Sequence, residues 1–474
     1  MELDISKKRI YSSVLDSTCI LELCFQYFTS KEKLKILCLC CKRWKQIITT
    51  SIPCWKYEQI KIIVGPNPLN SFLLKSCSLL QYLELNEVRD RHYVTPLDKL
   101  NQLKEIKSLK LNEFKEHFQQ LSTIYFPKLT TLKLLDNYSS DLSNENGICI
   151  QEFVSRHSTI HSLFIILGSF DRFNYFAPLY ISLKKLVLTI RGISNKKIEL
   201  LSKFIHLEYL TITTYDLTEE QTEEEEEKKY MFPSLTYLCL DNYFHLFSSF
   251  DSLSKLEHLT INSYGRSTNP LLDAKTTEYL NQQKFPCLQT LSLYGLKGCS
   301  SFDFSFLTTS TCLKEISLSS LEEKNYENLF TTIKTHPESF FRLKTFIIKL
   351  HEKKKEGKKQ KKRNLSFDFL IHLPQLNQLY IRYNLFSKWD LYYISDLSCL
   401  QDLVLTYNIP SQYNSSFEIE ANPTCSSLAG HFKKLLPLKS TLKSCKLYNI
   451  YVNEKDKEIW KEFTYGKYFE VHLR

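Results

Sequence analysis

Three cysteines stand within four positions near the start of the 474-residue sequence: Cys38, Cys40 and Cys41. Cysteine thiolates are ligands for zinc, but a structural zinc site needs four ligands in a tetrahedral arrangement. No second pair of Cys or His residues follows at zinc spacing, so we predict no metal site.

The other cysteines are scattered through apolar segments, as at Cys77, Cys239, Cys287 and Cys445. In a chain that begins without a secretory signal, this pattern is typical of buried free thiols in a reducing compartment. The apolar stretches, such as residues 163–167, are far too short to span a bilayer. We therefore expect a cytoplasmic and/or nuclear protein that is not inserted in a membrane.

Catalytic motifs are missing from the sequence. It has no G-x-S-x-G nucleophile motif, no H-E-x-x-H zinc motif and no P-loop, and its ten glycines are few for a nucleotide-binding fold. Of the twelve histidines only His157 and His161 stand four residues apart, and they are not part of an H-E-x-x-H motif. We predict that the protein is not an enzyme, has no catalytic residues and needs no cofactor.

The formal net charge of +10 comes mostly from one run, Lys353 to Arg363, and an acidic run spans Glu223 to Glu227. Both runs are typical of solvated loops. The basic run also fits a nuclear localisation signal or a contact with nucleic acid. Because no aromatic residues are interleaved with its lysines, we do not expect the fold to bind nucleic acid. If this run does contact nucleic acid, the protein would be a nuclear nucleic-acid-associated protein, which we keep as a hypothesis ranked below the two given at the end of this subsection.

One apolar motif recurs through most of the chain: aliphatic, two residues, aliphatic, one residue, aliphatic. Its fourteen copies begin at Leu80, Ile106, Leu129, Ile160, Leu183, Leu207, Leu235, Leu256, Leu288, Leu313, Leu343, Leu376, Leu400 and Leu442. The last three residues of each motif alternate with period two, which predicts a short strand with one buried face. A single such strand cannot bury that face, so stacked copies should form a parallel sheet.

The segments between the motifs should return along the back of this sheet. Several of them have apolar residues at every third or fourth position and are predicted to be helical: Asn70–Cys77, Asn195–Phe204 and Thr276–Gln282. Several motifs follow an apolar residue and a proline, as at Phe126-Pro127, and this proline should end the preceding segment and start an extended one.

These motifs and their intervals resemble the leucine-rich repeats. The resemblance implies an α/β leucine-rich-repeat solenoid, with parallel strands on the concave face and helices or loops on the convex face. We predict about fourteen repeats over residues 57–450, with insertions near 218–229 and 351–364, and a C-terminal cap over residues 451–474. An ordinary α/β domain with alternating strands and helices is the alternative.

Residues 1–56 lack the strand motif and are predicted to form short amphipathic helices. The stretch Leu34-Lys-Ile-Leu37-Cys-Leu39-Cys40-Cys41-Lys42-Arg43-Trp44 resembles the apolar helix of an F-box, which ends in Cys, two basic residues and Trp. Trp55 corresponds to the family's second Trp. A plain helical cap that protects the first repeat is the alternative.

The F-box resemblance implies docking on the Skp-type adaptor of a cullin–RING ubiquitin ligase. Apolar anchors would fill a groove of that adaptor. The residues carried over to the contact are Leu15, Ile20, Phe25, Leu34, Leu37, Cys41, Trp44 and Trp55. The predicted function is therefore the substrate-recognition subunit of an SCF-type ubiquitin ligase. The second hypothesis is a leucine-rich-repeat scaffold with no ligase role.

The target protein, whose identity the sequence does not give, should bind the concave face. There the residues between the buried strand positions point outward, and exposed tyrosines are favoured binding anchors. The predicted target-binding residues are Tyr82, Tyr209, Tyr237, His258, Tyr294, Tyr380 and Tyr448.

Overall fold

The computed structural model divides into two compact units, of which unit 1 comprises Met1–Leu210 and Thr214–Glu224 and unit 2 comprises Thr211–Thr213 and Glu225–Arg474. The structure describes residues 59–64, 80–87, 97–112, 118–135, 144–167, 173–190, 195–214, 229–242, 247, 250–251, 253–263, 277–296, 302–349, 365–382, 388–406, 432–448, 458 and 468–472. The predicted adaptor-binding residues Leu15 to Trp55, the helix at Asn70–Cys77 and nearly all of both predicted insertions lie outside these ranges.

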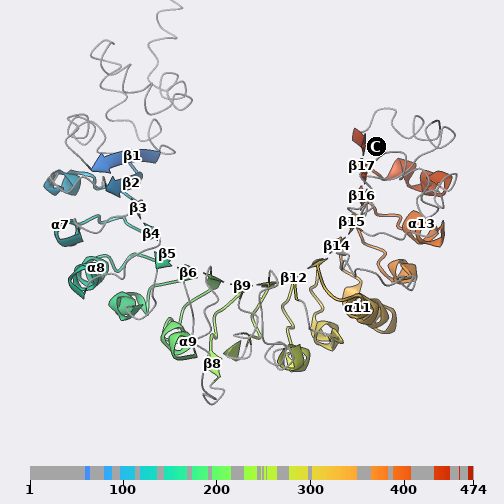
Figure 1. Ribbon diagram of the computed structural model, residues 1–474, viewed down its shortest axis with the longest axis horizontal. Helices are drawn as coiled ribbons and strands as arrows, with labels where there is room; N and C mark the ends of the chain where they lie inside the picture. The colour runs from blue at the N-terminus through green and yellow to red at the C-terminus, as the bar shows by residue number, and fades with distance from the viewer. Residues whose placement is uncertain are drawn as a thin grey trace, which may run out of the picture. The chain divides into compact units, whose positions relative to one another are not determined.

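Unit 1 contains a parallel sheet whose strand order follows the chain. Its strands are β1 (Gln59–Val64), β2 (Tyr82–Glu87), β3 (Ser108–Asn112), β4 (Thr131–Leu135), β5 (Ser162–Leu167), β6 (Lys185–Ile190) and β7 (Tyr209–Thr214), within which the division between the units falls. The return segments are η1 (Asp98–Gln102), α7 (Phe118–Ser122), α8 (Asn144–Arg156), η2 (Phe173–Leu179) and α9 (Asn195–Ser202). These helices lie on one side of the strands (Figure 1).

Unit 2 has the same arrangement. Its main strands are β9 (Tyr237–Asp241), β11 (His258–Asn262), β12 (Thr290–Tyr294), β13 (Glu315–Ser319), β14 (Thr345–Lys349), β15 (Gln378–Arg382), β16 (Asp402–Thr406), β17 (Ser444–Tyr448) and β18 (Tyr468–His472). The returns are residues 277–282, η4 (Ser305–Thr309), α11 (Glu323–Thr335), α12 (Pro337–Phe340), η5 (Asp368–His372), α13 (Lys388–Ser395) and η6 (Phe432–Ser440). Two short strands, β8 (Tyr230–Met231) and β10 (Phe250–Asp251), form a separate parallel pair.

Neighbouring strands pair so that equal motif positions meet. In β11 and β12, Leu259 pairs with Leu291 and Ile261 pairs with Leu293. All three apolar positions of each of the fourteen motifs are buried. A slip of one residue would turn the buried side chains of a strand to the solvent, so the alternation fixes this register.

A second set of backbone hydrogen bonds links one repeat to the next at the start of twelve of the fourteen motifs. The carbonyl of Lys107 accepts the N–H groups of Thr130 and Thr131, at 2.9 and 3.0 Å. The same double acceptance recurs in unit 2, where Glu257 O accepts the N–H groups of Gln289 and Thr290. These bonds provide acceptors for the backbone N–H groups at the point where the chain enters the strand.

In nine of the fourteen motifs the residue three positions before the motif closes a tight turn. In the Phe126-Pro127 copy the N–H of Leu129 donates to the carbonyl of Phe126 at 3.1 Å, and Phe285 and Leu288 repeat this bond. The proline therefore occupies the second position of a turn, where its fixed φ fits, rather than beginning an extended segment as predicted. Phe126 and Phe285 are both fully buried under the returns.

Both units thus have the predicted α/β leucine-rich-repeat fold, and each of the fourteen predicted strands is present. Two further strands extend the series. In β1, Ile60 and Ile62 pair with Leu83 and Leu85, and β18 pairs in parallel with β17 inside the segment predicted as the cap. The predicted helix at Asn195–Phe204 is α9, and the one at Thr276–Gln282 is helical over residues 277–282.

The alternation within one strand can be tested in β11. Leu259 is fully buried, whereas the next residue, Thr260, is partly exposed. Leu259→Ala should lower the free energy of unfolding by about 2–5 kcal/mol, because it removes core contacts and leaves a cavity. Thr260→Ala should change it by less than about 0.5 kcal/mol. Urea denaturation followed by circular dichroism measures both, and equal effects would contradict the assigned faces.

Candidate functional site

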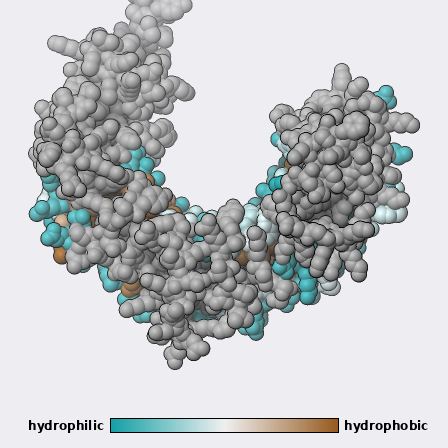
Figure 2. Space-filling view, viewed as in Figure 1, coloured by the Kyte–Doolittle hydropathy of each residue, from teal (hydrophilic) through white to brown (hydrophobic). Residues whose placement is uncertain are grey.

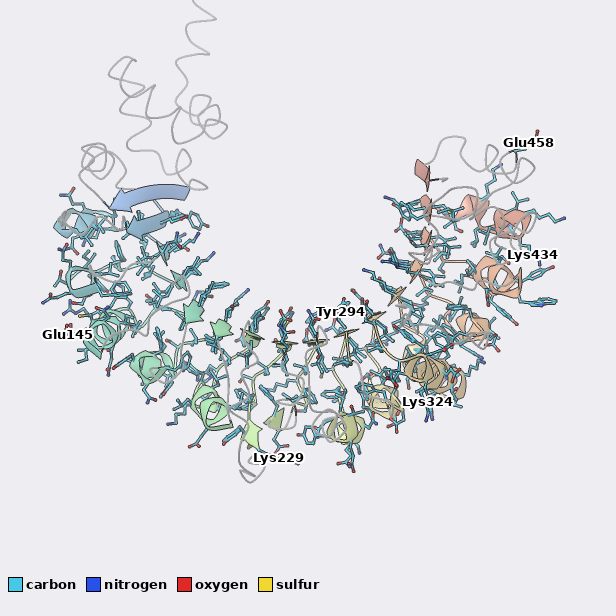
Figure 3. All side chains as sticks on the ribbon, in the orientation of Figure 1. Glu145, Lys229, Tyr294, Lys324, Lys434 and Glu458 are labelled. Carbon is cyan, nitrogen blue, oxygen red and sulfur yellow. The ribbon has the colours of Figure 1, made fainter. Side chains whose placement is uncertain are left out.

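The candidate site is the solvent side of each sheet, which we call the strand face. It carries the alternate residues of each strand, as in β3, where Ser108, Lys110 and Asn112 are partly exposed while Leu109 and Leu111 are buried. Because the strands are in register, these residues form a first, a central and a third column across the strands. In unit 2, Tyr294 lies on this face, whereas Lys324 and Lys434 lie on the opposite, helix side (Figure 3).

All seven residues predicted to bind the target lie on the strand face and are partly exposed. Unit 1 carries two of them and unit 2 carries five. By column, the first contains Tyr82, Tyr209, Tyr237 and His258, the central contains Tyr380, and the third contains Tyr294 and Tyr448.

Only some of these seven residues are brought together. The rings of Tyr237 and His258 face each other across β9 and β11 with centroids 5.9 Å apart. The hydroxyl of Tyr294 instead lies 2.9 Å from Ser317 Oγ. Lys349 lies over the ring of Tyr380, with its Nζ 5.2 Å from the ring centroid. The five residues of unit 2 are therefore anchors spread along the face rather than one compact pocket.

Unit 1 carries a tighter group, which we call the lysine–aromatic strip: Lys133, Phe164, Lys185 and Tyr209. Lys133 Nζ and Lys185 Nζ lie 5.0 and 5.5 Å from the centroid of the Phe164 ring. Lys185 Nζ also lies 4.0 Å from the centroid of the Tyr209 ring. Of the four residues, only Tyr209 was among the predicted binding residues.

An ion pair occupies the neighbouring strands of unit 1. Glu84 of β2 lies 3.4 Å from Lys110 Nζ, and its Oε1 accepts a hydrogen bond of 2.6 Å from Asn112 Nδ2. The charge of Lys110 is therefore balanced on the strand face. No comparable carboxylate stands in β4, β5 or β6, whose sequences are TLKLL, SLFIIL and KLVLTI.

The central column of unit 2 contains small side chains over four strands, namely Cys239, Thr260, Ser292 and Ser317. Ser292 and Ser317 are only 8% and 3% exposed. Burial, and to a smaller extent the nearby carboxylate of Asp241, raises the pKa of Cys239 to about 11. The Cys239 thiol is therefore protonated at neutral pH, and thiols in that state are poor nucleophiles.

The predicted burial of the cysteines holds at only some positions. Cys445 is fully buried, and burial raises its pKa to about 12. Cys239 is half-buried and Cys287 is exposed, which corrects the prediction for Cys287. Cys287 stands in the turn between Phe285 and Leu288, where the side chain between the two buried residues points to the solvent.

A buried histidine joins two repeats of unit 1. His157 occupies the position three residues before a motif, where Phe126 and Phe204 stand in other repeats, and it is 1% exposed. Its Nε2 accepts the N–H of Phe126 at 2.9 Å, and its Nδ1 lies 2.7 Å from the carbonyl of Phe153. Burial lowers the pKa of His157 below its ordinary value of 6.5, so the neutral ring with a proton on Nδ1 satisfies both partners.

Aromatic residues are also exposed on the helix side of unit 2. Trp389 and Tyr392 are 57% and 44% exposed, and Lys434 Nζ lies 3.2 Å from the Tyr392 ring centroid. A separate open hollow of about 490 Å³ is lined by Pro337, Glu338, Phe341, Ile371, His372 and Pro374. The described surface visible in Figure 2 is mostly hydrophilic, with scattered hydrophobic residues.

Within the ranges that the structure describes, no group of three or more His, Cys, Asp or Glu side chains is placed to hold a metal ion. None of the described helices is both long and apolar enough to cross a bilayer.

Neither a protein-family model nor a curated protein sequence matches the chain. Among solved structures, an internalin (inlF) of Listeria monocytogenes is similar with 14% identity and a TM-score of 0.38, covering 78% of this chain and 81% of its own. A leucine-rich-repeat protein of Leptospira interrogans has 13% identity and a TM-score of 0.36, covering 87% and 100%. TLR13, in its complex with ssRNA13, has 16% identity and a TM-score of 0.38, covering 90% and 63%.

The buried His157 predicts a pH dependence of stability. Its pKa is lowered in the folded state, so the unfolded chain binds this proton more readily. Stability should therefore fall as the pH drops below about 6.5, the ordinary histidine value, until the folded-state pKa is passed. Thermal unfolding of wild type and His157→Phe between pH 7.5 and 5 measures this dependence.

His157→Phe should be less stable at pH 7.5 by about 1–3 kcal/mol, because the N–H of Phe126 loses its acceptor. Its midpoint should fall less on acidification than that of wild type, because phenylalanine does not titrate. The matched control is His161→Phe at an exposed position, which should keep the wild-type pH dependence. An equal fall in wild type and His157→Phe would contradict the role assigned to this ring.

Proposed function

We propose that the chain binds another protein along the strand face of its repeats. The observation that carries this proposal is the set of aligned columns on that face, where partly exposed aromatic and lysine side chains recur at equal positions of successive strands. Tyrosine offers a large contact area with few rotatable bonds, so ordering it on binding requires little entropy. A sheet that presents such residues in rows suits an extended contact with a protein surface.

We further propose that residues 1–56 form an F-box and that the protein is the substrate-recognition subunit of an SCF-type ubiquitin ligase. The support is the sequence Leu34 to Trp44, with its Cys41-Lys42-Arg43-Trp44 ending, followed by Trp55. A helix that only capped the first repeat would not require this combination. Leucine-rich repeats directly after such a segment fit a receptor in which one end docks on the adaptor and the repeats hold the target.

The adaptor contact would use the side chains named in the sequence: Leu15, Ile20, Phe25, Leu34, Leu37, Cys41, Trp44 and Trp55. Tryptophan and leucine are effective anchors in a groove because a few fully desolvated side chains provide most of the binding free energy. The target contact would use Tyr82 and Tyr209 in unit 1 and the five predicted residues in unit 2. The two contacts share no residues, so each can be removed separately.

Two variants test the ligase role. Leu37→Asp and Trp44→Asp each place a carboxylate where the proposed contact requires an apolar side chain, and removal of a central anchor should weaken adaptor binding by about 2 kcal/mol or more. Co-purification of the full chain with a recombinant Skp-type adaptor measures the effect. Lys446→Glu in β17, on the strand face of unit 2, is the control and should leave adaptor binding unchanged.

If the wild-type chain does not retain the adaptor, the ligase role is wrong, and the protein is a leucine-rich-repeat scaffold with a helical cap. If Leu37→Asp and Trp44→Asp bind as wild type does, the assignment of the F-box residues is wrong. Urea unfolding of each variant shows whether the repeats remain folded. A loss of binding counts only when this transition is unchanged.

A further inference from the structure

We infer that the lysine–aromatic strip of unit 1 binds an acidic, extended segment of the partner protein. The inference rests on the proposed protein-binding function and specifies the chemistry of its ligand. Its residues come from four successive strands: Lys133 from β4, Phe164 from β5, Lys185 from β6 and Tyr209 from β7.

The two lysines of the strip are held by rings rather than by carboxylates. Both ammonium groups lie within 5.5 Å of the Phe164 centroid, and Lys185 lies 4.0 Å from that of Tyr209. A cation over an aromatic face is attracted by the ring quadrupole and loses part of its hydration. An ammonium group has three N–H donors, and the contact with a ring leaves donors directed at an incoming carboxylate.

The charge around the strip is positive. Nearby lysines at the edge of the strand face are already paired, since Lys128 Nζ lies 2.8 Å from Glu105 and Lys184 Nζ lies 2.8 Å from Glu208. By contrast, β4, β5 and β6 contain no acidic residue at all. Two cations that are not balanced within their own strands attract a negatively charged partner and orient its approach.

The spacing of the two lysines fits an extended chain. Lys133 pairs with Phe164 in register, so one strand separates Lys133 from the strand of Lys185. Both ammonium groups lie within 5.5 Å of the Phe164 centroid, so they are at most about 11 Å apart, and an extended chain advances by about 3.3 Å per residue. A partner segment that crosses the strands would therefore bring carboxylates three residues apart to the two ammonium groups.

The residues beside the strip are apolar, which favours aliphatic side chains between those carboxylates. Leu135, Ile166 and Val187 are partly exposed on the strand faces of β4, β5 and β6. Burying such side chains on binding adds about 25 cal/mol per Å² of apolar area. A segment that alternates acidic and aliphatic residues matches both features of the surface.

A nucleic acid is the less favoured ligand. Binding of single strands relies on bases that stack on open aromatic faces. Here Lys133 and Lys185 lie over the ring of Phe164, and Lys185 also lies over the ring of Tyr209. Stacking of a base would have to displace these ammonium groups, whereas a carboxylate binds them where they are.

The test measures fluorescence anisotropy with the full chain and a labelled peptide of four Asp-Leu-Ser repeats, which places an acid at every third position. Wild type should bind this probe, and the double variant Lys133→Glu/Lys185→Glu should bind it at least about tenfold more weakly, since it reverses both charges. Phe164→Ala should weaken binding by about threefold, because the lysines lose the ring that holds them. A peptide of Lys-Leu-Ser repeats should not bind.

The matched control is the double variant Lys324→Glu/Lys446→Glu in unit 2, with one change on the helix side and one on the strand face, which alters the net charge by the same amount. It should bind the acidic probe as wild type does. Equal losses in the two double variants would overturn the inference, because the effect would then come from net charge alone. Should Lys133→Glu/Lys185→Glu fail to fold, Lys133→Gln/Lys185→Gln replaces it and should also weaken binding.

Two further outcomes would overturn the inference. One is the absence of acidic-peptide binding by wild type. The other is tighter binding of a twelve-residue oligothymidylate that is lost in Lys133→Glu/Lys185→Glu, which would make the strip a nucleic-acid surface. Neither outcome affects capture of the Skp-type adaptor, because that contact uses residues 1–56. Failure of this inference is thus distinguishable from failure of the proposed ligase role.

Discussion

The parallel register between neighbouring strands is the constraint on which the rest of each unit depends. Equal motif positions meet across every described pair, such as Leu259 with Leu291 and Leu109 with Leu132. The side-chain period of a strand is two, so this register alone decides which residues form the core and which form the strand face. The carbonyl of Lys107 accepts two N–H groups of the next repeat, and equivalent bonds at eleven other motifs fix the same register where those strands begin.

The helix side follows from the turn before each motif. That turn buries one side chain per repeat, commonly phenylalanine, as at Phe126 and Phe285. Where a polar residue stands at this position instead, the structure provides a partner: His157 bonds to Phe126 and Phe153, and Ser310 Oγ donates to the carbonyl of Phe285 at 2.7 Å. A buried polar group without a partner is strongly destabilising. These bonds therefore explain how the repeats accommodate His157 and Ser310 at a position that is apolar in most other repeats.

The strands could be predicted from the sequence because their signal is local. Three apolar residues at fixed spacing mark each strand, and at every motif the positions predicted to be buried are buried in the structure. The returns were harder to predict, since several are five-residue 3₁₀ helices, such as η1 and η4, which are too short to show a helical period. Strands β1 and β18 carry the last two apolar positions of the motif, Ile60 with Ile62 and Phe469 with Val471, but Tyr57 and Gly466 stand where the motif begins with an aliphatic residue, so the search did not find them.

The lysine–aromatic strip was harder still to predict, because its members come from four strands and one of their contacts, Lys185 with Phe164, is diagonal. A search for tyrosine in the outward positions found Tyr209 but neither Phe164 nor Lys185. Phe164 stands at an outward position of the motif that begins at Ile160, but a search restricted to tyrosine does not select it. Lys185 is opposite Ser162 in register yet contacts Phe164, one column away. Only the pairing of the strands reveals that the outward-facing residues Lys133, Phe164, Lys185 and Tyr209 form one group. Since these outward residues take no part in the core, they can change without disturbing the repeats, and that freedom allows a leucine-rich-repeat sheet to acquire a binding chemistry of its own.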